Sequence, residues 1–325
     1  MQYTTLGKTG VKVSRLCFGT MSFGGDADEE TSAALFQRCR DAGINFFDCA
    51  NIYSKGRAEE ILGRLMKGCR DELVITTKVG FSMNDGRVEP GLSRRSIMMS
   101  AEDSLRRLQT DRIDVYFCHT FDKTTPMEET LRALSDLVSQ GKVLYIGLSN
   151  WAAWQIARAI GKTELLRLAP VSVVQPMYNL VKRTAETEIL PLAEAEGLGV
   201  IPYSPLGGGL LTGKYTTTQR DPAGRLATWS TYERRYADER FYEVAERFCE
   251  YARSKGLHPA TLAVAWVKAN PAVTAPILGA RNVEQLEPSL AAADLDLSSD
   301  QRDEIAALGD PPPVATDRTE ERDRS

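Results

Sequence analysis

Four residues with complementary acid–base chemistry follow three successive apolar runs of the chain. Asp48 and Tyr53 come after the first of these runs, Lys78 closes the second, and His119 closes the third. A tyrosine has an ordinary pKa of about 10, but a lysine ammonium at hydrogen-bonding distance favours the phenolate and lowers that pKa. Asp48 can pair with the lysine, and His119 can orient a carbonyl oxygen by a hydrogen bond. Together these groups can protonate an oxygen while hydride reaches the neighbouring carbon.

Each of these residues also has an ordinary structural role. A tyrosine after a strand commonly packs against the core, and a lysine at a strand end is commonly solvated. A lone histidine is often a satisfied structural group, and Asp48 can serve in a turn or as a helix N-cap. Spacing alone therefore leaves the catalytic and the structural interpretations both open.

Short β-rich apolar runs alternate with longer amphipathic segments along most of the chain. The predicted strands cover residues 15–18, 45–47, 73–78, 113–118, 143–148, 171–174, 200–203 and 274–278. The predicted helices cover residues 29–42, 57–66, 94–108, 127–139, 152–160, 185–196, 240–255, 259–269 and 283–292.

This alternation predicts βα units and a parallel sheet. Eight strands over about 280 residues fit an α/β protein of the (β/α)8 TIM barrel class. The competing doubly wound sheet would need a G-x-G-x-x-G turn after the first strand, and residues 18–24 (FGTMSFG) do not supply one. In a barrel, catalytic groups lie at the carboxyl ends of the strands, which is where the four residues fall.

Three segments lie outside the strand–helix alternation. Residues 4–13 predict an N-terminal β-hairpin that caps the barrel, and residues 206–240 predict a long irregular loop after the seventh strand. Residues 310–325 are rich in proline and charge, so we expect a mobile, disordered tail. The predicted organisation is one barrel domain over residues 1–309, followed by this tail.

The composition narrows the possible partners and surroundings. The net charge is −4, with 40 basic and 44 acidic residues, and this gives no reason to expect nucleic-acid binding. The N-terminus has no signal-peptide pattern, and no stretch approaches the roughly 20 apolar residues of a membrane helix. The six cysteines include no C-x-x-C pair, so we expect reduced thiols, a cytoplasmic protein and no metal site.

Several motifs resemble the aldo-keto reductase family. They are residues 43–53 (GINFFDCANIY), 75–78 (ITTK), 114–119 (DVYFCH), 147–150 (GLSN), 203–206 (YSPL), 209–215 (GLLTGKY) and 279–286 (GARNVEQL). The similarity extends over roughly residues 3–298. It implies a (β/α)8 barrel and a catalytic tetrad of Asp48, Tyr53, Lys78 and His119, with Tyr53 as the general acid in reduction.

The resemblance also implies a nicotinamide cofactor, NADP or NAD, held without a Rossmann domain. Ser149, Asn150 and Gln175 would hold the carboxamide, and Tyr203 would stack on the nicotinamide ring. The other implied cofactor contacts are Gly19, Thr20, Met21, Asp48, Ser204, Pro205, Leu206, Gly207, Gly208, Lys214, Gly279 and Gln285.

Arg281 is the basis for expecting NADP as the cofactor. It lies at the start of the last helix, where the dipole and free N–H groups favour a phosphate. Its guanidinium suits the 2′-phosphate of NADP, so we expect NADP over NAD. Residues 288–289 read Pro-Ser where family members often have Glu-Asn, which leaves the adenine contacts open.

Three functions fit this resemblance. The first is an NAD(P)H-dependent reductase of aldehydes, ketones or sugar-derived carbonyls. The second is a cofactor-binding regulatory subunit, because residues 91–94 and 125–130 are similar to the β-subunits of potassium channels. The third is an alcohol or sugar dehydrogenase, which runs the same chemistry in the oxidative direction. His119 favours an enzyme, and neither the substrate nor the oligomeric state follows from the sequence.

Overall fold

Within the described residues, eight parallel strands form one continuous sheet. The computed structural model describes residues 1–81, 83, 89–218, 221–222 and 224–316. Neighbouring strands follow the order β10-β3-β4-β5-β6-β7-β8-β9, and each neighbouring pair is parallel. The strands are β3 (Cys17–Gly19), β4 (Phe46–Asp48), β5 (Val74–Val79), β6 (Ile113–Cys118), β7 (Val143–Ser149), β8 (Val171–Gln175), β9 (Gly199–Val200) and β10 (Ile277–Leu278).

The two end strands, β9 and β10, meet and close the sheet. The Thr274 amide donates to the Val200 carbonyl at 2.9 Å, and the Ile277 amide donates to the Pro202 carbonyl at 2.9 Å. Backbone hydrogen bonds therefore continue across the seam, as they do in a barrel. The predicted (β/α)8 barrel is confirmed, and the doubly wound sheet is excluded because that sheet stays open.

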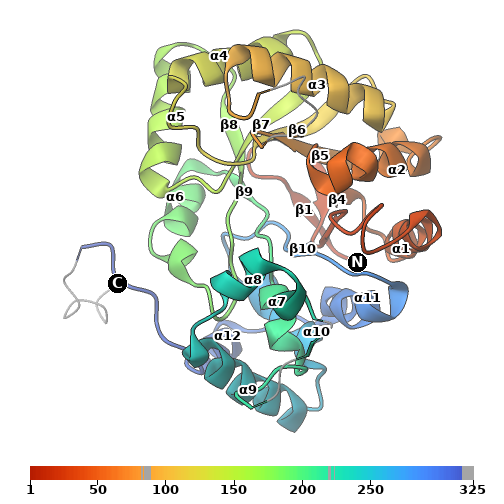
Figure 1. Cartoon of the computed structure of the whole chain (residues 1–325). Coiled ribbons are helices and arrows are strands. Elements are labelled where there is room, and N and C mark those ends of the chain that lie inside the picture. The colour runs from red at the N-terminus through yellow and green to blue at the C-terminus, as the bar shows by residue number, and fades with distance from the viewer. Residues whose placement is uncertain (82, 84–88, 219–220, 223, 317–325) are drawn as a thin grey trace.

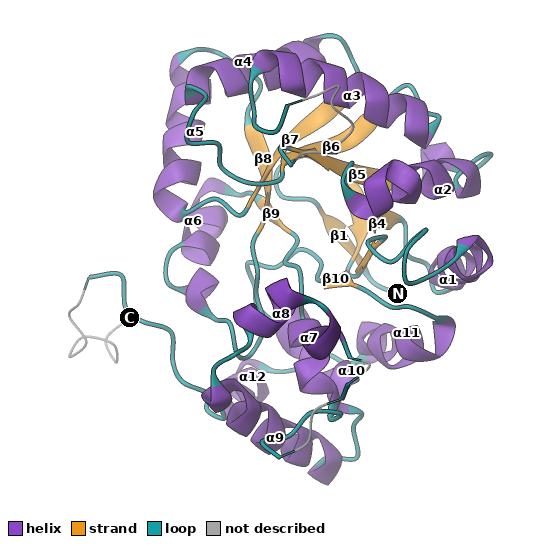
Figure 2. Cartoon of the chain, in the orientation of Figure 1, coloured by secondary structure: helices purple, strands orange, loops and turns teal. Residues whose placement is uncertain are grey.

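Helices surround the strands (Figures 1 and 2). Those predicted from the sequence are α1 (Glu29–Asp41), α2 (Arg57–Leu65), α3 (Arg94–Leu108), α4 (Met127–Ser139), α5 (Ala153–Leu165), α6 (Ile189–Glu196), α9 (Glu239–Ser254), α10 (Pro259–Lys268) and α11 (Val283–Leu290). The bounds of α3 and α4 equal the predicted ones, and Ser93 caps α3, since its Oγ accepts from the Ser96 amide at 3.2 Å.

Two helix predictions were inaccurate at their ends. The helix predicted over residues 152–160 continues to Leu165, and the one predicted over residues 185–196 begins only at Ile189. Proline explains the late start of α6, because Pro191 lacks an amide proton and fits only in the first turn of a helix. A separate 3-10 helix, η3 (Thr184–Glu186), takes the preceding residues.

The N-terminal hairpin is present and seals one end of the barrel. Strands β1 (Tyr3–Thr5) and β2 (Lys12–Ser14) pair antiparallel. Leu6 and Val13 are fully buried in a cluster with side chains of the barrel interior. The Lys8 amide donates to the Gly197 carbonyl, just before β9 begins, at 3.1 Å. The hairpin therefore covers the amino ends of the strands, opposite to the predicted site.

The segment after β9 is more regular than the sequence predicted. Within residues 206–240 lie a 3-10 helix, η4 (Gly207–Thr212), and two short helices, α7 (Arg225–Thr228) and α8 (Ser230–Arg235). The Arg225 guanidinium lies over the rings of Trp229 and Tyr232, at 5.7 and 5.4 Å from their centroids. This stacking stabilises helices that are too short to show a hydrophobic period. Residues 219–220 and 223 lie outside the described residues.

A last helix, α12 (Ser299–Ala306), was not predicted. It buries only Ile305 and Ala306, so its sequence shows little amphipathic pattern. Ser298 caps it: Ser298 Oγ accepts from the Gln301 amide, and Gln301 Oε1 accepts from the Ser298 amide. A charged, weakly patterned helix of this kind depends on its tertiary contacts.

The predicted tail is described only in part. Residues 310–316 contain no helix or strand, and the Pro313 carbonyl accepts a hydrogen bond from Thr187 Oγ1 at 2.9 Å. Residues 317–325 lie outside the described residues. The division into a barrel of residues 1–309 and a disordered tail stays a prediction.

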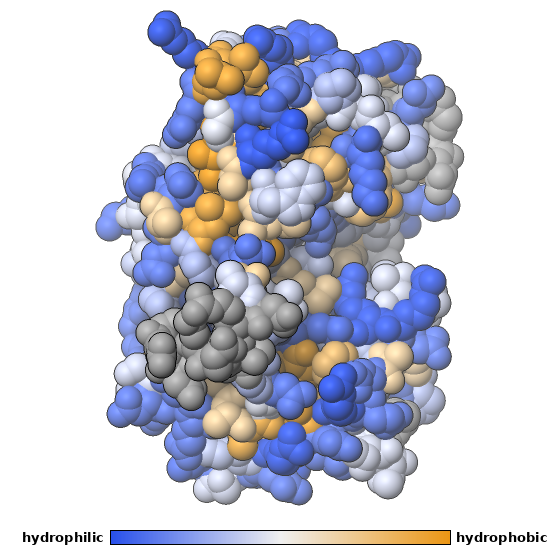
Figure 3. Space-filling model, turned by 90° about the vertical axis from the view of Figure 1, so that its left-hand side faces the viewer, coloured by the Kyte–Doolittle hydropathy of each residue, from blue (hydrophilic) through white to orange (hydrophobic). Residues whose placement is uncertain are grey.

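The face of the molecule shown in Figure 3 is mostly polar, with separate apolar patches. Among the described residues, the most exposed large apolar side chains are Leu165 and Trp154, at 81% and 60% exposure. Among the described helices, none is both long enough and apolar enough to span a membrane.

Candidate active site

The four predicted catalytic residues lie at the carboxyl ends of three neighbouring strands. Asp48 ends β4, Lys78 is the next-to-last residue of β5, and His119 directly follows β6. Tyr53 begins a 3-10 helix, η1 (Tyr53–Gly56), shortly after β4. Parallel pairing brings these strand ends to one rim of the barrel.

Lys78 lies at the centre of the group and is fully buried. Its Nζ lies 2.6 Å from Asp48 Oδ2, 2.6 Å from the Cys49 carbonyl oxygen and 3.3 Å from Tyr53 Oη. Burial lowers the pKa of Lys78, but the charge and hydrogen bond of Asp48, together with Tyr53 and Cys49, outweigh burial and raise it above the ordinary value. Lys78 is therefore an ammonium at neutral pH.

Asp48 is held from several sides and is almost fully buried. Oδ1 accepts from Thr76 Oγ1 at 2.6 Å and from Gln175 Nε2 at 2.9 Å, while Oδ2 accepts from Lys78. The Asp48 carbonyl accepts from the Thr20 amide at 2.8 Å, which ties β4 to the loop after β3. A buried carboxylate is tolerated because it is paired and hydrogen-bonded.

Tyr53 keeps its proton more firmly than the sequence led us to expect. Burial raises the pKa of Tyr53 above its ordinary value, and the charge of Lys78 only partly offsets this effect. The lysine acts with the predicted sign, but desolvation of the phenolate is the larger contribution. The hydroxyl is thus protonated at neutral pH, as a proton donor must be.

His119 is neutral in this environment. Burial lowers the pKa of its imidazole well below the ordinary value, and the nearby Lys78 ammonium lowers it further. The ring lies edge-on to Tyr53 and to Phe81, with centroids 6.1 and 4.7 Å apart. His119 Nδ1 is buried and has no hydrogen-bond partner among the described residues. A neutral imidazole carries one N–H that can donate to a carbonyl oxygen.

The residues predicted to hold the carboxamide and the ring of a nicotinamide form one hydrogen-bonded chain. Tyr203 Oη donates to Asn150 Oδ1 at 2.7 Å, and Asn150 Nδ2 donates to the His119 carbonyl at 2.9 Å and to Ser149 Oγ at 3.2 Å. Ser149 Oγ donates to the Gln175 carbonyl at 3.0 Å, and Gln175 donates to Asp48 as described above. The predicted nicotinamide contacts and the tetrad therefore share one network.

The segment after β9 carries several of the predicted cofactor contacts. The Ser204 carbonyl accepts from Asn179 Nδ2 at 2.9 Å, and Pro205 and Leu206 lead into η4, which holds Gly207 and Gly208. Gly208 has φ +69°, and a Cβ there would lie 2.8 Å from the ring of Tyr232, so only glycine lets α8 pack this closely.

Lys214 lies further along the same segment and is exposed. Its Nζ pairs with Asp221 Oδ2 at 3.2 Å. The structure thus gives this lysine a carboxylate partner that a phosphate would have to replace or share.

A second rim segment contains the predicted phosphate site. Arg281 and Gln285 flank the start of α11, where Asn282 Oδ1 caps the helix by accepting from the Gln285 amide at 2.9 Å. Gly279 is exposed, and a Cβ there would meet no atom within 4 Å. The open backbone, the helix start and the cation together suit a bound phosphate.

Sequence reasoning missed the residue that pairs with Arg281. Arg281 Nε lies 3.5 Å from Asp26 Oδ2, and Arg225 of α7 lies 3.8 Å from the same oxygen. Ser22 Oγ donates to the Ala280 carbonyl at 2.7 Å, which holds the two loops together. Gly19, Thr20 and Met21 lie in the same stretch after β3, with Gly19 and Thr20 buried and Met21 half-buried.

Thr76 was also missed, although the sequence contains a signal for it. It lies two residues before Lys78 in β5, so both side chains point to the same face of the strand. No group of three or more His, Cys, Asp or Glu side chains in the described part of the chain is arranged to hold a metal.

The fold and the site together define a (β/α)8 barrel protein with a buried Asp–Lys pair and a half-buried tyrosine at the carboxyl ends of its strands. The family model of the aldo/keto reductase family matches residues 15–310. The chain belongs to this family, whose members generally use nicotinamide cofactors and bind small-molecule substrates, and it is an oxidoreductase.

Three relatives illustrate the range of the similarity. An uncharacterized oxidoreductase, YrpG, of Bacillus subtilis is 41% identical over 311 residues, covering 92% of this chain and 93% of that protein. A probable voltage-gated potassium channel subunit beta of Arabidopsis thaliana is 39% identical over 302 residues, covering 91% and 92%. Norsolorinic acid reductase of Aspergillus flavus is 34% identical over 311 residues, covering 91% and 78%.

Proposed function

We propose that this oxidoreductase reduces a carbonyl group, in an aldehyde, a ketone or a sugar-derived compound, to an alcohol at the expense of NAD(P)H. The observation that carries the proposal is the chain from the buried Asp48 and Lys78 to the half-buried Tyr53, with Nζ 2.6 Å from the carboxylate and 3.3 Å from the phenol oxygen. A charged lysine beside a protonated tyrosine is suited to giving a proton to an oxygen.

In this proposal each residue has one task. Tyr53 gives its hydroxyl proton to the carbonyl oxygen, and the Lys78 ammonium stabilises the phenolate that remains. Asp48 keeps Lys78 charged and in place. Neutral His119 donates a hydrogen bond that orients the carbonyl. A bound nicotinamide supplies the hydride for the carbon.

The same proposal assigns the cofactor contacts. Ser149, Asn150 and Gln175 would hold the carboxamide, and Tyr203 would stack on the ring. The helix start at Arg281 would take the adenosine 2′-phosphate, so we propose NADP rather than NAD as the cofactor. The remaining contacts are those predicted after β3, after β9 and at the start of α11. We also propose a cytoplasmic location, consistent with six free cysteines.

A second candidate is a regulatory, cofactor-binding subunit. It is favoured by the 39% identity to a probable potassium channel subunit beta. Against it, His119 completes the tetrad and lies beside Tyr53. The oxidative direction, an alcohol or sugar dehydrogenase, uses the same residues with Tyr53 as the base.

The test is a carbonyl screen followed at the absorbance of the reduced nicotinamide, with NADPH and NADH, on the wild type and Tyr53→Phe. Because the variant lacks the acidic proton, its kcat should fall by about 100- to 10,000-fold while the Kd for the cofactor stays within about 2-fold. Full activity in Tyr53→Phe would refute the role of Tyr53. A wild type that binds cofactor but reduces nothing would favour the regulatory subunit.

A further inference from the structure

The backbone directly after Tyr53 is strained. Ser54 and Lys55 have φ values of 48° and 56°, and Gly56 follows with φ 90°. Residues with a Cβ rarely adopt positive φ, and two in succession persist only where the surroundings hold them. Some contact must therefore fix the segment that links Tyr53 to α2.

The first turn of α2 is fixed by a buried carboxylate. Glu59 is fully buried, and its Oε1 accepts from Thr77 Oγ1 at 2.5 Å. Its Oε2 accepts from Arg107 Nε of α3 at 2.7 Å. Moving Glu59 out of this position would break its ion pair with Arg107. A buried carboxylate without a partner is strongly unfavourable, so the pair holds Glu59 in place.

The strand β5 connects this contact to the tetrad. Successive side chains of a strand point to opposite faces, so Thr77 faces the helices while Lys78 faces the barrel interior. Thr77 bonds Glu59 of α2, and Lys78 bonds Tyr53 Oη. One strand therefore holds both ends of the segment from Tyr53 to Glu59.

Close packing leaves little freedom between these contacts. A Cβ on Gly56 would lie 2.9 Å from Arg107 Cδ, so the left-handed turn lies directly against the arginine stem. Ser54 Oγ donates to the Phe23 carbonyl at 2.7 Å and fixes the turn from the opposite direction.

We propose that Thr77, Glu59 and Arg107 are positioning residues: they hold α2 and the strained turn so that Tyr53 Oη stays within hydrogen-bonding distance of Lys78 Nζ. The expected effect of these residues on turnover rests on the proposed function of Tyr53 as proton donor. The placement of the tyrosine itself does not depend on it.

The test compares Thr77→Val, which has nearly the same shape without the hydroxyl, with Thr77→Ser, which keeps it. In Thr77→Val, kcat should fall by about 10- to 100-fold, while KM and the Kd for NADPH stay within about 2-fold, because a small misplacement of a reacting group mainly slows chemistry. Thr77→Ser should restore most of the wild-type kcat.

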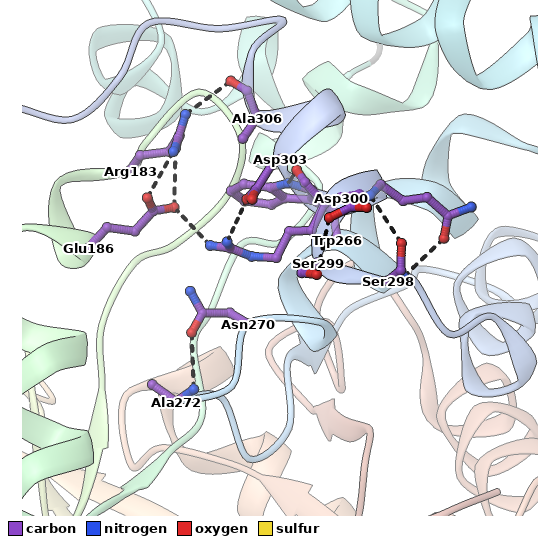
Figure 4. A network of polar contacts seen from close by, with 12 residues as sticks. Arg183, Glu186, Trp266, Asn270, Ala272, Ser298, Ser299, Asp300, Asp303 and Ala306 are labelled. Atoms are coloured by element: carbon purple, nitrogen blue, oxygen red, sulfur yellow. Dashed lines mark hydrogen bonds and ion pairs between the residues drawn. The ribbon is translucent and has the colours of Figure 1, made fainter. Parts of the chain in front are cut away.

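A readout independent of turnover follows Tyr53 directly. In protein labelled with 3-fluorotyrosine, the fluorine signal of Tyr53 is identified by its loss in Tyr53→Phe. Thr77→Val and Glu59→Gln should shift or broaden this signal, and Thr77→Ser should leave it unchanged. The control is Glu186→Gln, which weakens the partly buried contact of Glu186 with Arg183 in a network that includes no residue of the tetrad (Figure 4). This variant should lose stability without moving the Tyr53 signal.

The outcomes separate the two proposals. A shifted Tyr53 signal in Thr77→Val supports the positioning role even if no carbonyl is ever turned over, in which case only the proposed function fails. An unshifted signal together with wild-type kcat in folded Thr77→Val overturns the positioning role and leaves the proposed function standing.

Discussion

At the scale of single residues, Lys78 is the group on which the site depends. An ammonium has three hydrogen-bond donors, and here they have three partners: Asp48, the Cys49 carbonyl and Tyr53. Full satisfaction fixes its position and offsets the cost of burying a charge. The lysine therefore fixes where the tyrosine hydroxyl lies as well as its electrostatic surroundings.

Arg281 allows a prediction at the same scale. If it binds the 2′-phosphate of NADP, Arg281→Ala removes a charge-assisted contact that NADH never makes. The affinity for NADPH should fall by about 10- to 100-fold and that for NADH by no more than about 2-fold. Both Kd values can be measured by quenching of protein fluorescence. An unchanged ratio of the two affinities would refute the assignment.

At the scale of elements, both faces of strand β5 make contacts that support the site. Thr76 and Lys78 face the interior and hold Asp48, while Thr77 faces outward and holds α2. The loops that carry the remaining groups are fixed by bonds between neighbouring strand ends, such as that from Asn150 to the His119 carbonyl. The site is thus built by strands and only completed by loops.

The terminal helix α12 is the element that depends most on tertiary contacts. Figure 4 shows its network with Arg183, Glu186 and Trp266. Trp266 Nε1 donates to the Arg302 carbonyl at 3.0 Å, and Arg183 Nη1 donates to the Ala306 carbonyl at 3.0 Å. These bonds join α12 to α10 and to the segment after β8.

Two shortened chains test whether α12 and its contacts stabilise the fold. A chain ending at Ser298 lacks α12 and the burial of Ile305, so its free energy of unfolding should fall by roughly 3–6 kcal/mol. A chain ending at Gly309 lacks only the predicted tail and should keep the wild-type Tm to within about 2 °C. Urea and thermal unfolding measure both. A large loss of stability in the chain that ends at Gly309 would show that residues 310–325 are part of the fold.

At the scale of the whole molecule, the hairpin that seals the barrel and the candidate active site lie at opposite ends of the barrel. The hairpin, through Leu6 and Val13, closes the amino ends of the strands, and the tetrad occupies the carboxyl ends. Substitutions in the hairpin can therefore change stability without changing the site. The same interior and its surrounding helices bury five of the six cysteines.

Burial of these thiols makes stability depend on pH. Burial raises the pKa of Cys39 above the ordinary value of 9.0. Above that pH the unfolded chain releases a proton that the folded chain keeps, so stability falls as the pH rises. In Cys39→Ala the slope of unfolding free energy against pH, above pH 9, should be shallower by about 1.4 kcal/mol per pH unit.

The comparison uses urea unfolding at a series of pH values. Leu35→Ala, in the same helix, is the control, because it also leaves a cavity but removes no thiol. It should be less stable than the wild type at every pH and keep the wild-type slope. Equal slopes in wild type and Cys39→Ala would contradict the prediction.

The order of residues along the chain was enough to predict the barrel, its eight strands and the rim on which the tetrad lies. Apolar periodicity and turn residues are local signals, and parallel strands bring their carboxyl ends together in any closed βα repeat. For this reason the order of strands and helices along the chain was enough to place Asp48, Lys78 and His119 side by side. Motif resemblance then favoured the catalytic over the structural interpretation of Tyr53.

How these groups are held depends on contacts between segments that are distant in the sequence. The raised pKa of Tyr53 follows from burial, which depends on every element packed around it and not on its neighbours in sequence. The pairing of Arg281 with Asp26 and the contact of Thr77 with Glu59 join residues from separate segments. The helices α7, α8 and α12 form because other elements bind them, since their own residues carry too weak a pattern to form them alone.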